Sequence, residues 1–219
     1  MRTALVTGST SGLGLQLCKT LIERKYKVYG LSRKTNNSSF SNIKHYKHIK
    51  CDLTKITSET QVSENIDDKL DIVINNAAIY LKKEFKFTEI KEISSIIDLN
   101  IKGTLHLTKS VLPFLKNTSS IIFINSVAGI NSIFGESIYC CTKHAIKSFA
   151  QTLGDEFSEQ GIRVMSIFPG GINTPMQNLN PKKKEFINPS LLSERIINMA
   201  EDTQIYIKDM TTLSYCEYF

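Results

Sequence analysis

The amino-acid sequence predicts an α/β domain in which a parallel, doubly wound sheet of seven strands carries helices on both faces. Short β-branched runs alternate with longer helical patterns, and most of these runs are apolar at nearly every position. Continuous apolar runs are typical of strands that are covered on both faces. The alternation of strands with helices is typical of parallel strands joined by right-handed crossovers.

The expected elements follow one another along the whole chain. Strands are expected at residues 3–7, 27–31, 48–52, 71–75, 120–125, 163–168 and 204–208. Helices are expected at residues 12–24, 56–67, 88–115, 136–159 and 190–200. No repeat, low-complexity tract or linker divides the sequence, so residues 1–219 are expected to form a single domain.

Charge, cysteine content and hydropathy limit the classes of function. The 27 basic and 21 acidic residues give a net charge of +6, and the basic residues are scattered, so no nucleic-acid partner is expected. The five cysteines lack metal-ligand spacing, which predicts no metal site and reduced thiols in a reducing compartment. No apolar run approaches the roughly 20 residues that span a bilayer, so a cytoplasmic protein without membrane contact is expected.

A glycine-rich turn, TGSTSGLG, follows the first expected strand and leads directly into a helical pattern. Glycines at such a turn allow backbone N–H groups to approach a pyrophosphate, and the helix dipole favours the anion. Three glycines alone would be ordinary loop chemistry, and their spacing is not GxGxxG, but their position at the first strand–helix junction favours a dinucleotide. The residues expected to contact it are Gly8, Ser9, Thr10, Ser11, Gly12, Leu13 and Gly14.

The second expected strand ends in LSRK, where a site specific for NAD would carry Asp or Glu for the ribose 2′-hydroxyl. Ser32 offers a hydroxyl and Arg33 a planar cation suited to a 2′-phosphate, with Lys34 in support. NADP(H) is therefore expected in preference to NAD(H); the alternative is that Arg33 and Lys34 only form a solvated loop. After the third strand, Asp52 is expected to bind the adenine amino group, with Leu53 beside it.

Tyr139 and Lys143 are four residues apart on an expected helix and therefore share one face. A tyrosine of pKa about 10 is a poor base at neutral pH, but a nearby cation lowers that pKa by about 1 to 3 units. Tyr46 and Lys50 have the same spacing without a serine partner, and we interpret that copy as coincidental. Ser126 ends the fifth expected strand, where its hydroxyl is suited to a carbonyl oxygen, although serine also commonly begins a loop.

Six ordered motifs resemble those of the short-chain dehydrogenase/reductase family, in its compact single-domain branch, over essentially the whole chain. They are TGSTSGLG (7–14), NNAA (75–78), NIKG (100–103), INSVAG (124–129), YCCTK (139–143) and PGGINT (169–174). The resemblance implies a Rossmann-like fold and an NAD(P)-dependent oxidoreductase. Ala78 replaces the usual glycine of NNAG, and little loss is expected because alanine is unstrained at negative φ.

The resemblance also implies a role for each site residue. Tyr139 would exchange a proton with the carbonyl or alcohol oxygen, while the nicotinamide exchanges hydride with the adjoining carbon. Lys143 would bind the nicotinamide ribose and lower the pKa of Tyr139, Ser126 would polarise the carbonyl, and Asn100 would hold a water linking Lys143 to solvent. Further cofactor contacts implied are Asn76, Ala77 and Ala78 at the adenosine ribose, and Pro169, Gly170, Ile172 and Thr174 around the nicotinamide.

The expected function is hydride transfer between NADP(H) and a ketone, aldehyde or 3-oxoacyl group. The alternative is a non-catalytic regulator that binds NADP(H), against which the complete set Asn100, Ser126, Tyr139 and Lys143 argues. A sugar-nucleotide epimerase or dehydratase would need a TGxxGxxG turn and a C-terminal substrate domain, which this sequence lacks.

Two further expectations concern the substrate and the assembly. Residues 175–190 are expected to form a short loop on the substrate side. One hypothesis is that Lys182 to Lys184 attract an anionic substrate; the alternative is that they only form a solvated loop. The helices expected at 88–115 and 136–159 carry apolar residues on more than one face, which indicates full burial or a subunit contact. The resemblance favours a homodimer or homotetramer joined through these helices, and burial within one chain is the alternative.

Overall fold

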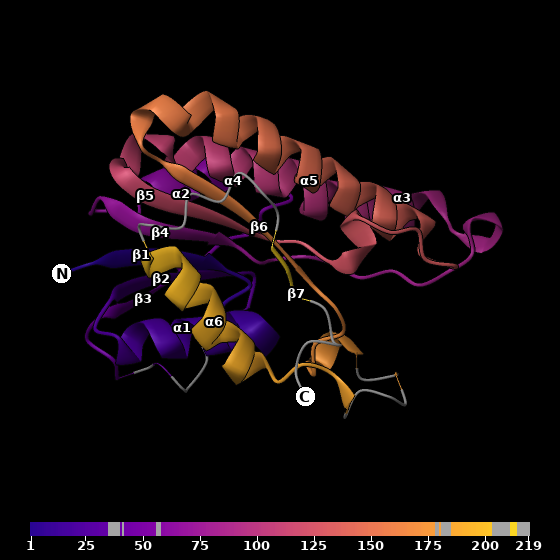
Figure 1. Ribbon diagram of the computed structural model, residues 1–219, viewed down its shortest axis with the longest axis horizontal. Helices are drawn as coiled ribbons and strands as arrows, with labels where there is room; N and C mark the ends of the chain where they lie inside the picture. The colour runs from indigo at the N-terminus through magenta and orange to yellow at the C-terminus, as the bar shows by residue number, and fades with distance from the viewer. Residues whose placement is uncertain are drawn as a thin grey trace.

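The computed structural model describes residues 1–34, 40, 42–55, 58–177, 180 and 185–202, together with the backbone of 211–213. These residues form one domain built on a parallel sheet of strand order β3-β2-β1-β4-β5-β6-β7 (Figure 1). The strands are β1 (Thr3–Thr7), β2 (Lys27–Ser32), β3 (Tyr46–Lys50), β4 (Leu70–Asn75), β5 (Leu115–Ile124), β6 (Arg163–Pro169) and β7 (Thr211–Leu213). The helices are α1 (Gly12–Glu23), α2 (Ser58–Ser63), α3 (Ile90–Ile97), α4 (Thr104–Val111), α5 (Ser137–Phe157) and α6 (Pro189–Glu201).

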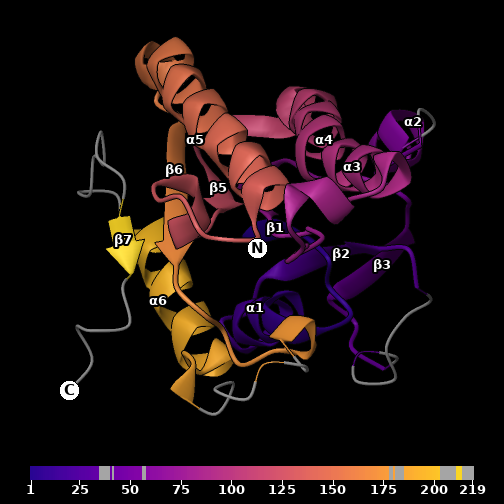
Figure 2. The same ribbon diagram turned by 90° about the vertical axis from the view of Figure 1, so that its right-hand side faces the viewer.

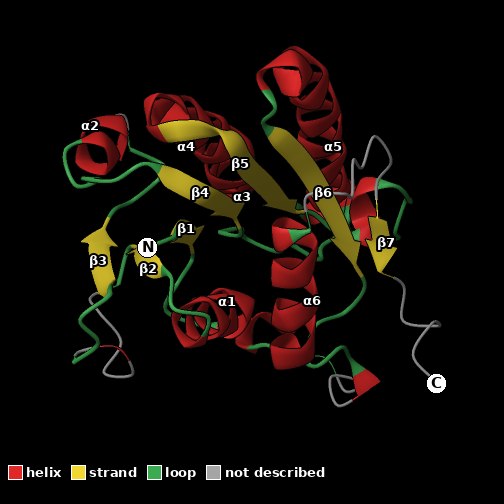
Figure 3. Cartoon of the chain, turned by 60° about the vertical axis from the view of Figure 1, so that its left-hand side comes forward, coloured by secondary structure: helices red, strands yellow, loops and turns green. Residues whose placement is uncertain are grey.

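Helices cover both faces of the sheet, as the apolar strands predict. Figures 2 and 3 show α1 and α6 on one face and α2, α4 and α5 on the other. Strand order reverses between β1 and β4, because β2 and β3 extend to one side and β4, β5 and β6 to the other. In a doubly wound sheet, the crevice at the carboxyl ends of the strands at such a reversal is where ligands bind.

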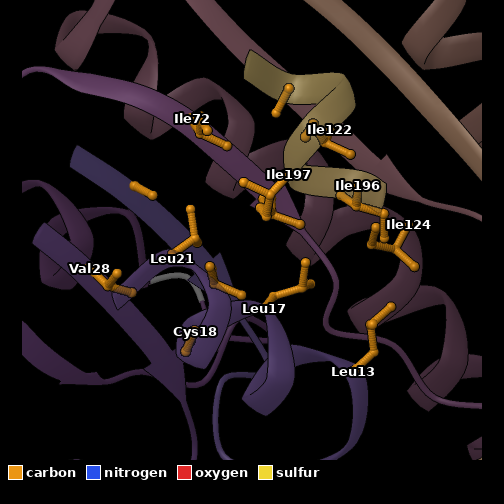
Figure 4. Packing of buried hydrophobic residues seen from close by; sticks show 14 of the residues in the cluster. Leu13, Leu17, Cys18, Leu21, Val28, Ile72, Ile122, Ile124, Ile196 and Ile197 are labelled. Carbon is orange, nitrogen blue, oxygen red and sulfur yellow. The ribbon is translucent and has the colours of Figure 1, made fainter. Parts of the chain in front are cut away.

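The α1 face shows how the sequence pattern builds the core. Leu13, Leu17 and Leu21 recur every four residues, so they form one stripe of α1 that is buried against the sheet. Ile196 and Ile197 of α6 complete this cluster (Figure 4). Burying each of these side chains contributes about 1.5–3 kcal/mol.

The strand prediction is confirmed for six strands. The seventh expected strand, at 204–208, lies outside the described residues. The strand that pairs with β6 is instead β7, where Thr211 lies beside Ile167. β5 also begins at Leu115, five residues earlier than expected.

The single helix expected at 88–115 is interrupted. Between α3 and α4 the chain forms a π-helical segment, η3 (Asp98–Gly103), and a 3₁₀ turn follows α4 at Leu112–Phe114. A Cβ at Gly103 would lie 2.9 Å from the Leu53 carbonyl oxygen, so helix and loop meet closely here. π segments are rare and are often found at functional sites. No helix of the described ranges is long and apolar enough to cross a bilayer.

Candidate functional site

A cavity of about 270 Å³ lies at the carboxyl ends of β1, β4 and β5, and it gathers most of the motifs that the sequence singles out. The glycine-rich turn contributes Gly8, Thr10, Ser11, Gly12 and Leu13 to its lining. The chain after β4 contributes Asn76, Ala77 and Ala78. Tyr139 and Lys143 of α5 also line the cavity, as do Ile172 and Thr174 after β6.

The turn after β1 takes a shape that only glycine allows at three positions. Gly8 and Gly12 have φ of +68° and +53°, in the left-handed region. A Cβ at Gly14 would lie 2.2 Å from the Gly8 carbonyl oxygen, so α1 begins in contact with the turn. The resulting cradle beside the start of α1 fits a dinucleotide pyrophosphate.

Two residues of the glycine-rich turn that were expected to contact the cofactor, Ser9 and Gly14, are not part of the cavity lining. Gly14 packs behind the turn, and Ser9 is buried, with its hydroxyl accepting a 3.4 Å hydrogen bond from the Tyr46 hydroxyl. Tyr46, whose YxxxK spacing we interpret as coincidental, therefore supports the turn from behind. Burial, its largest influence, raises the pKa of Tyr46 to about 12.

Hydrogen bonds fix the chain after β4 beside the turn. The Thr7 hydroxyl oxygen accepts from the backbone N–H groups of Asn76 at 2.9 Å and Ala77 at 2.8 Å. The Asn76 amide donates to the Thr7 carbonyl oxygen at 2.8 Å. Lys25 is the only non-glycine residue with positive φ in the described part of the chain, so Ala78 needs no strained backbone.

The far end of the cavity is lined by the residues expected to bind the 2′-phosphate, Ser32, Arg33 and Lys34. The Lys34 carbonyl oxygen accepts from the Ser32 hydroxyl at 3.0 Å and lies 2.9 Å from His48 Nε2. These contacts hold the backbone of this segment while the side chains of Arg33 and Lys34 remain exposed.

Of the two residues expected at the adenine, Leu53 lines the cavity and Asp52 lies just outside its lining. The Asp52 carboxylate accepts from the Thr54 backbone N–H at 3.1 Å and hydroxyl at 2.8 Å. Burial opposes ionisation of Asp52, but these hydrogen bonds and the charge of Arg33 hold its pKa below the usual value.

Tyr139 and Lys143 are brought together on one face of α5, where both side chains are buried, with 8% and 5% of their surfaces exposed. Lys143 Nζ lies 5.6 Å from the centroid of the Tyr139 ring and donates to the Ile124 carbonyl oxygen at 2.9 Å. Burial lowers the pKa of Lys143 to about 8. Ser126, at the end of β5, is hydrogen-bonded to the Tyr139 hydroxyl.

The pKa of Tyr139 is raised, contrary to the expectation from the sequence. Burial is the main cause, the Ser126 hydrogen bond acts in the opposite direction, and electrostatic interactions with Glu136 and Cys140 raise the pKa further. Lys143 was expected to lower the pKa of Tyr139, and this effect is not found. The physical reason is that the Lys143 ammonium is itself buried and donates to a backbone carbonyl rather than to the phenol.

Asn100 lies in η3 and is buried outside the cavity lining. Its Oδ1 accepts from the Ile79 backbone N–H at 2.7 Å, and its Nδ2 donates to the Ile79 carbonyl at 2.9 Å and the Thr142 hydroxyl at 3.2 Å. The side chain thus joins η3 to the chain after β4 and to α5. The expected water relay would have to use the backbone of Asn100 rather than its amide.

The chain after β6 closes the cavity beside the turn. Thr174 packs against Gly12, whose added Cβ would lie 3.2 Å from the Thr174 Cβ. Pro169 and Gly170, expected to contact the nicotinamide, are not part of the lining. In the loop expected at 175–190, a 3₁₀ turn (Pro175–Gln177) is described, and Lys182 to Lys184 lie outside the described residues.

Sequence reasoning missed several residues that line the cavity. They are Leu31, Cys51, Leu99, Ile124, Asn125, Pro175 and Met176. Asn125 is the most informative, because its Oδ1 accepts from the Ser126 backbone N–H at 2.9 Å and its Nδ2 donates to the Lys143 carbonyl oxygen at 3.1 Å. It fixes two site residues relative to each other. A polar residue directly before Ser126 in INSVAG was the available signal.

Comparison with known proteins identifies the family. The model of the short chain dehydrogenase family matches residues 2–185. An uncharacterized oxidoreductase of Staphylococcus epidermidis is 32% identical over 187 residues, covering 80% of each chain. A structure of 3-ketoacyl-(acyl-carrier-protein) reductase from Brucella melitensis complexed with NADH has a TM-score of 0.89 at 20% identity, covering 100% of this chain and 98% of that one. A structure of ElxO with NADP bound has a TM-score of 0.85 at 23% identity, covering 98% and 97%. The chain therefore belongs to the short-chain dehydrogenase/reductase family, whose members are NAD(P)-dependent oxidoreductases.

Proposed function

We propose that the protein is a cytoplasmic, NADP(H)-dependent oxidoreductase acting on a ketone, aldehyde or 3-oxoacyl group and the corresponding alcohol. The observation that carries the proposal is the single cavity lined at one end by Arg33 and Lys34 and at the other by Tyr139 and Lys143, with the glycine-rich turn between them. A dinucleotide lying along this cavity would present its phosphate end to cations and its nicotinamide end to an acid/base pair.

The cofactor supplies or accepts the hydride, and the protein supplies orientation and a proton. The Tyr139 hydroxyl donates its proton to a carbonyl oxygen in reduction and removes it from the alcohol in oxidation. Ser126, hydrogen-bonded to that phenol, is suited to bind the same substrate oxygen. Lys143 would bind the nicotinamide ribose. The water expected to link Lys143 to solvent would bind the backbone carbonyl oxygen of Asn100.

Preference for NADP(H) rests on the residues after β2. Arg33 is exposed beside the cavity and offers a fork of donors to a 2′-phosphate, whereas a carboxylate at this position would repel it. Structural neighbours have been solved with NADH or with NADP, so the neighbours do not decide between the cofactors. We therefore expect Arg33→Ala to weaken NADPH binding about tenfold or more while leaving NADH binding nearly unchanged.

The deciding experiment follows NADPH absorbance with a panel of ketones, aldehydes and 3-oxoacyl thioesters. Tyr139→Phe should lower turnover about 100- to 10,000-fold, because the proton donor is lost while the ring remains. Tyr46→Phe is the matched control, since that tyrosine also stands four residues before a lysine but lies behind the turn. Unchanged turnover in Tyr139→Phe, or an equal loss in both variants, would contradict the mechanism.

We also propose a homodimer or homotetramer joined through the outer sides of α3, α4 and α5. Ile146 and Leu153 are buried within their own chain, which is the alternative explanation for the apolar helix faces. Ile93, Ile97 and Ile138 are only half-buried, so part of their apolar surface is free to form a subunit contact. Light scattering should give two or four times the 24.7 kDa chain mass, and a monomer at micromolar concentration would exclude this assembly.

A further inference from the structure

A buried carboxylate that no motif includes lies next to Tyr139. Glu136 directly precedes α5, and only 7% of its surface is exposed. It stands three residues before Tyr139, which brings the two side chains to the same side of the start of α5. None of the ion pairs between described residues includes Glu136. A buried carboxylate without a cation needs another explanation.

Tyr80, in the loop between β4 and α3, holds this carboxylate in place. Its hydroxyl donates to Glu136 Oε1 at 2.6 Å, and its ring packs edge-on against the ring of Tyr139, with centroids 5.0 Å apart and planes at 88°. A second bond between the same loops runs from the Lys83 backbone N–H to the Gly135 carbonyl oxygen at 2.6 Å. Glu136, Tyr80 and Tyr139 therefore form one packed group.

We propose that Glu136 is a positioning residue whose buried carboxylate keeps the Tyr139 hydroxyl protonated and thereby raises the pH at which alcohol oxidation begins. The inference rests on the proposed function, because it assigns a pH dependence to the same site. A carboxylate near a phenol disfavours the phenolate, since removal of the phenolic proton would leave two like charges in a buried environment.

The other ionisable groups around Tyr139 do not cancel this effect. Cys140 lies on the same helix and acts in the same direction as Glu136, and Tyr80 faces Tyr139 from the loop after β4. Lys143 is the one buried cation of this group, and its ammonium donates to the Ile124 carbonyl oxygen. Two further lysines lie nearby: Lys83 is paired with Glu92 at 2.7 Å, and Lys82 is exposed, with its Cγ 3.9 Å from the place of a Cβ on Gly135.

The proton balance explains why the pH dependence of oxidation is affected. In reduction the O–H bond of Tyr139 breaks, a new O–H bond forms on the substrate oxygen, and the carbonyl carbon gains the hydride that NADPH supplies. Solvent then returns a proton to the phenolate. In oxidation the phenolate must exist first, so a neighbouring carboxylate raises the pH at which oxidation begins.

The test compares three variants that separate charge from packing. Glu136→Gln removes the charge and keeps an acceptor for the Tyr80 hydroxyl. Glu136→Asp keeps the charge, and Tyr80→Phe removes the hydrogen bond while keeping both the charge and the ring. Circular dichroism and thermal unfolding first establish that each variant is folded.

The first readout is the pH dependence of kcat/KM for alcohol oxidation with NADP⁺. In Glu136→Gln the rising limb should move to lower pH by about 1 unit, whereas Glu136→Asp and Tyr80→Phe should stay within about 0.3 unit of the wild type. A limb that is unmoved in Glu136→Gln, or moved equally in Glu136→Gln and Glu136→Asp, would overturn the proposal.

The second readout needs neither cofactor nor turnover. Protein labelled with ¹³C at tyrosine Cζ is titrated by NMR, and the signal of Tyr139 is assigned as the one missing from Tyr139→Phe. Glu136→Gln should titrate at lower pH than the wild type at this signal, and identical titrations would overturn the inference. The Tyr80 signal should move as well, because burial and then the hydrogen bond to Glu136 raise the pKa of Tyr80. If Tyr139→Phe retains full turnover, the proposed mechanism fails, while this titration still measures whether Glu136 acts on Tyr139.

Discussion

The turn after β1 and the first two turns of α5 face the same cavity, but they are built by different physical means. The turn shapes its cradle with glycine backbone, and Gly8 and Gly12 have positive φ there. The start of α5 instead buries ionisable side chains, Glu136, Tyr139 and Lys143. An anion site that needs only backbone N–H groups avoids buried charge, whereas proton transfer requires side chains whose ionisation burial alters.

Folding the two regions therefore costs free energy for different reasons. In the turn, glycine costs conformational entropy on folding, which is about 0.5–1 kcal/mol per residue relative to alanine. In α5, Lys143 is buried with its ammonium donating to a carbonyl group, and its pKa falls to about 8 from 10.5. Folding must work against this charge at neutral pH, so α5 is the region where the proposed function opposes stability.

Replacing Lys143 should have the largest effect and sharpen this contrast. Because its folded pKa of about 8 lies below the unfolded 10.5, the unfolded chain binds more protons between these values. The penalty is therefore full below pH 8 and disappears as the pH rises towards 10.5. Lys143→Met should lower turnover about 100-fold or more and raise the free energy of unfolding at pH 7 by about 2 kcal/mol.

Urea unfolding at pH 7 and at pH 10 measures the effect of Lys143→Met on the free energy of unfolding. The gain in stability should be smaller at pH 10 than at pH 7. The exposed Lys109 on α4 provides the control, since Lys109→Met should change the free energy of unfolding by no more than about 0.5 kcal/mol at either pH. If Lys143→Met is destabilised equally at both pH values, burial of the charge is not the dominant cost at this helix.

The turn was more predictable from sequence than the site around α5, because its geometry is local. The glycine spacing identified the positions where a side chain is excluded, and Gly8 and Gly12 do line the cavity. Ser9 and Gly14 were also expected to contact the cofactor, but neither is part of the cavity lining. Which residue of a turn faces inward depends on what packs behind it, here Tyr46 of a distant strand.

Around α5 the sequence identified the residues but not their interactions. The YxxxK spacing placed Tyr139 and Lys143 on one face, but the direction of the Tyr139 pKa depends on burial and on Glu136, which the motif does not include. Asn100 was expected within a regular helix and lies in a π segment bound to Ile79. Such features arise from packing between elements that are far apart in the sequence.

Adding a methyl group at Gly14 tests whether the turn depends on backbone contact. The new Cβ would lie 2.2 Å from the Gly8 carbonyl oxygen, so α1 would have to move away from the turn. Gly14→Ala should lower the free energy of unfolding by about 2–3 kcal/mol and weaken NADPH binding, measured by urea unfolding and fluorescence titration. Gly154→Ala, inside α5 with its nearest neighbour at an ordinary 3.7 Å, should instead stabilise by about 0.5–1 kcal/mol.

Equal effects in these two variants would mean that close backbone contact does not distinguish the turn from an ordinary helical glycine. A loss of stability in Gly14→Ala without any loss of NADPH affinity would separate the fold of the turn from its binding role. Either result would weaken the contrast with α5.

The smallest expected effect concerns the hydrogen bonds behind the turn. Thr7→Val keeps the shape of the side chain but removes the hydroxyl oxygen that accepts from the N–H groups of Asn76 and Ala77. Leaving these part-buried N–H donors without their acceptor should lower the free energy of unfolding by about 1–2 kcal/mol, against no more than about 0.5 kcal/mol for the exposed Thr118→Val in β5. Because no charge is involved, the loss should be the same at pH 7 and pH 10, unlike the gain expected for Lys143→Met. A pH-dependent loss would mean that the turn, like α5, is coupled to a buried ionisable group.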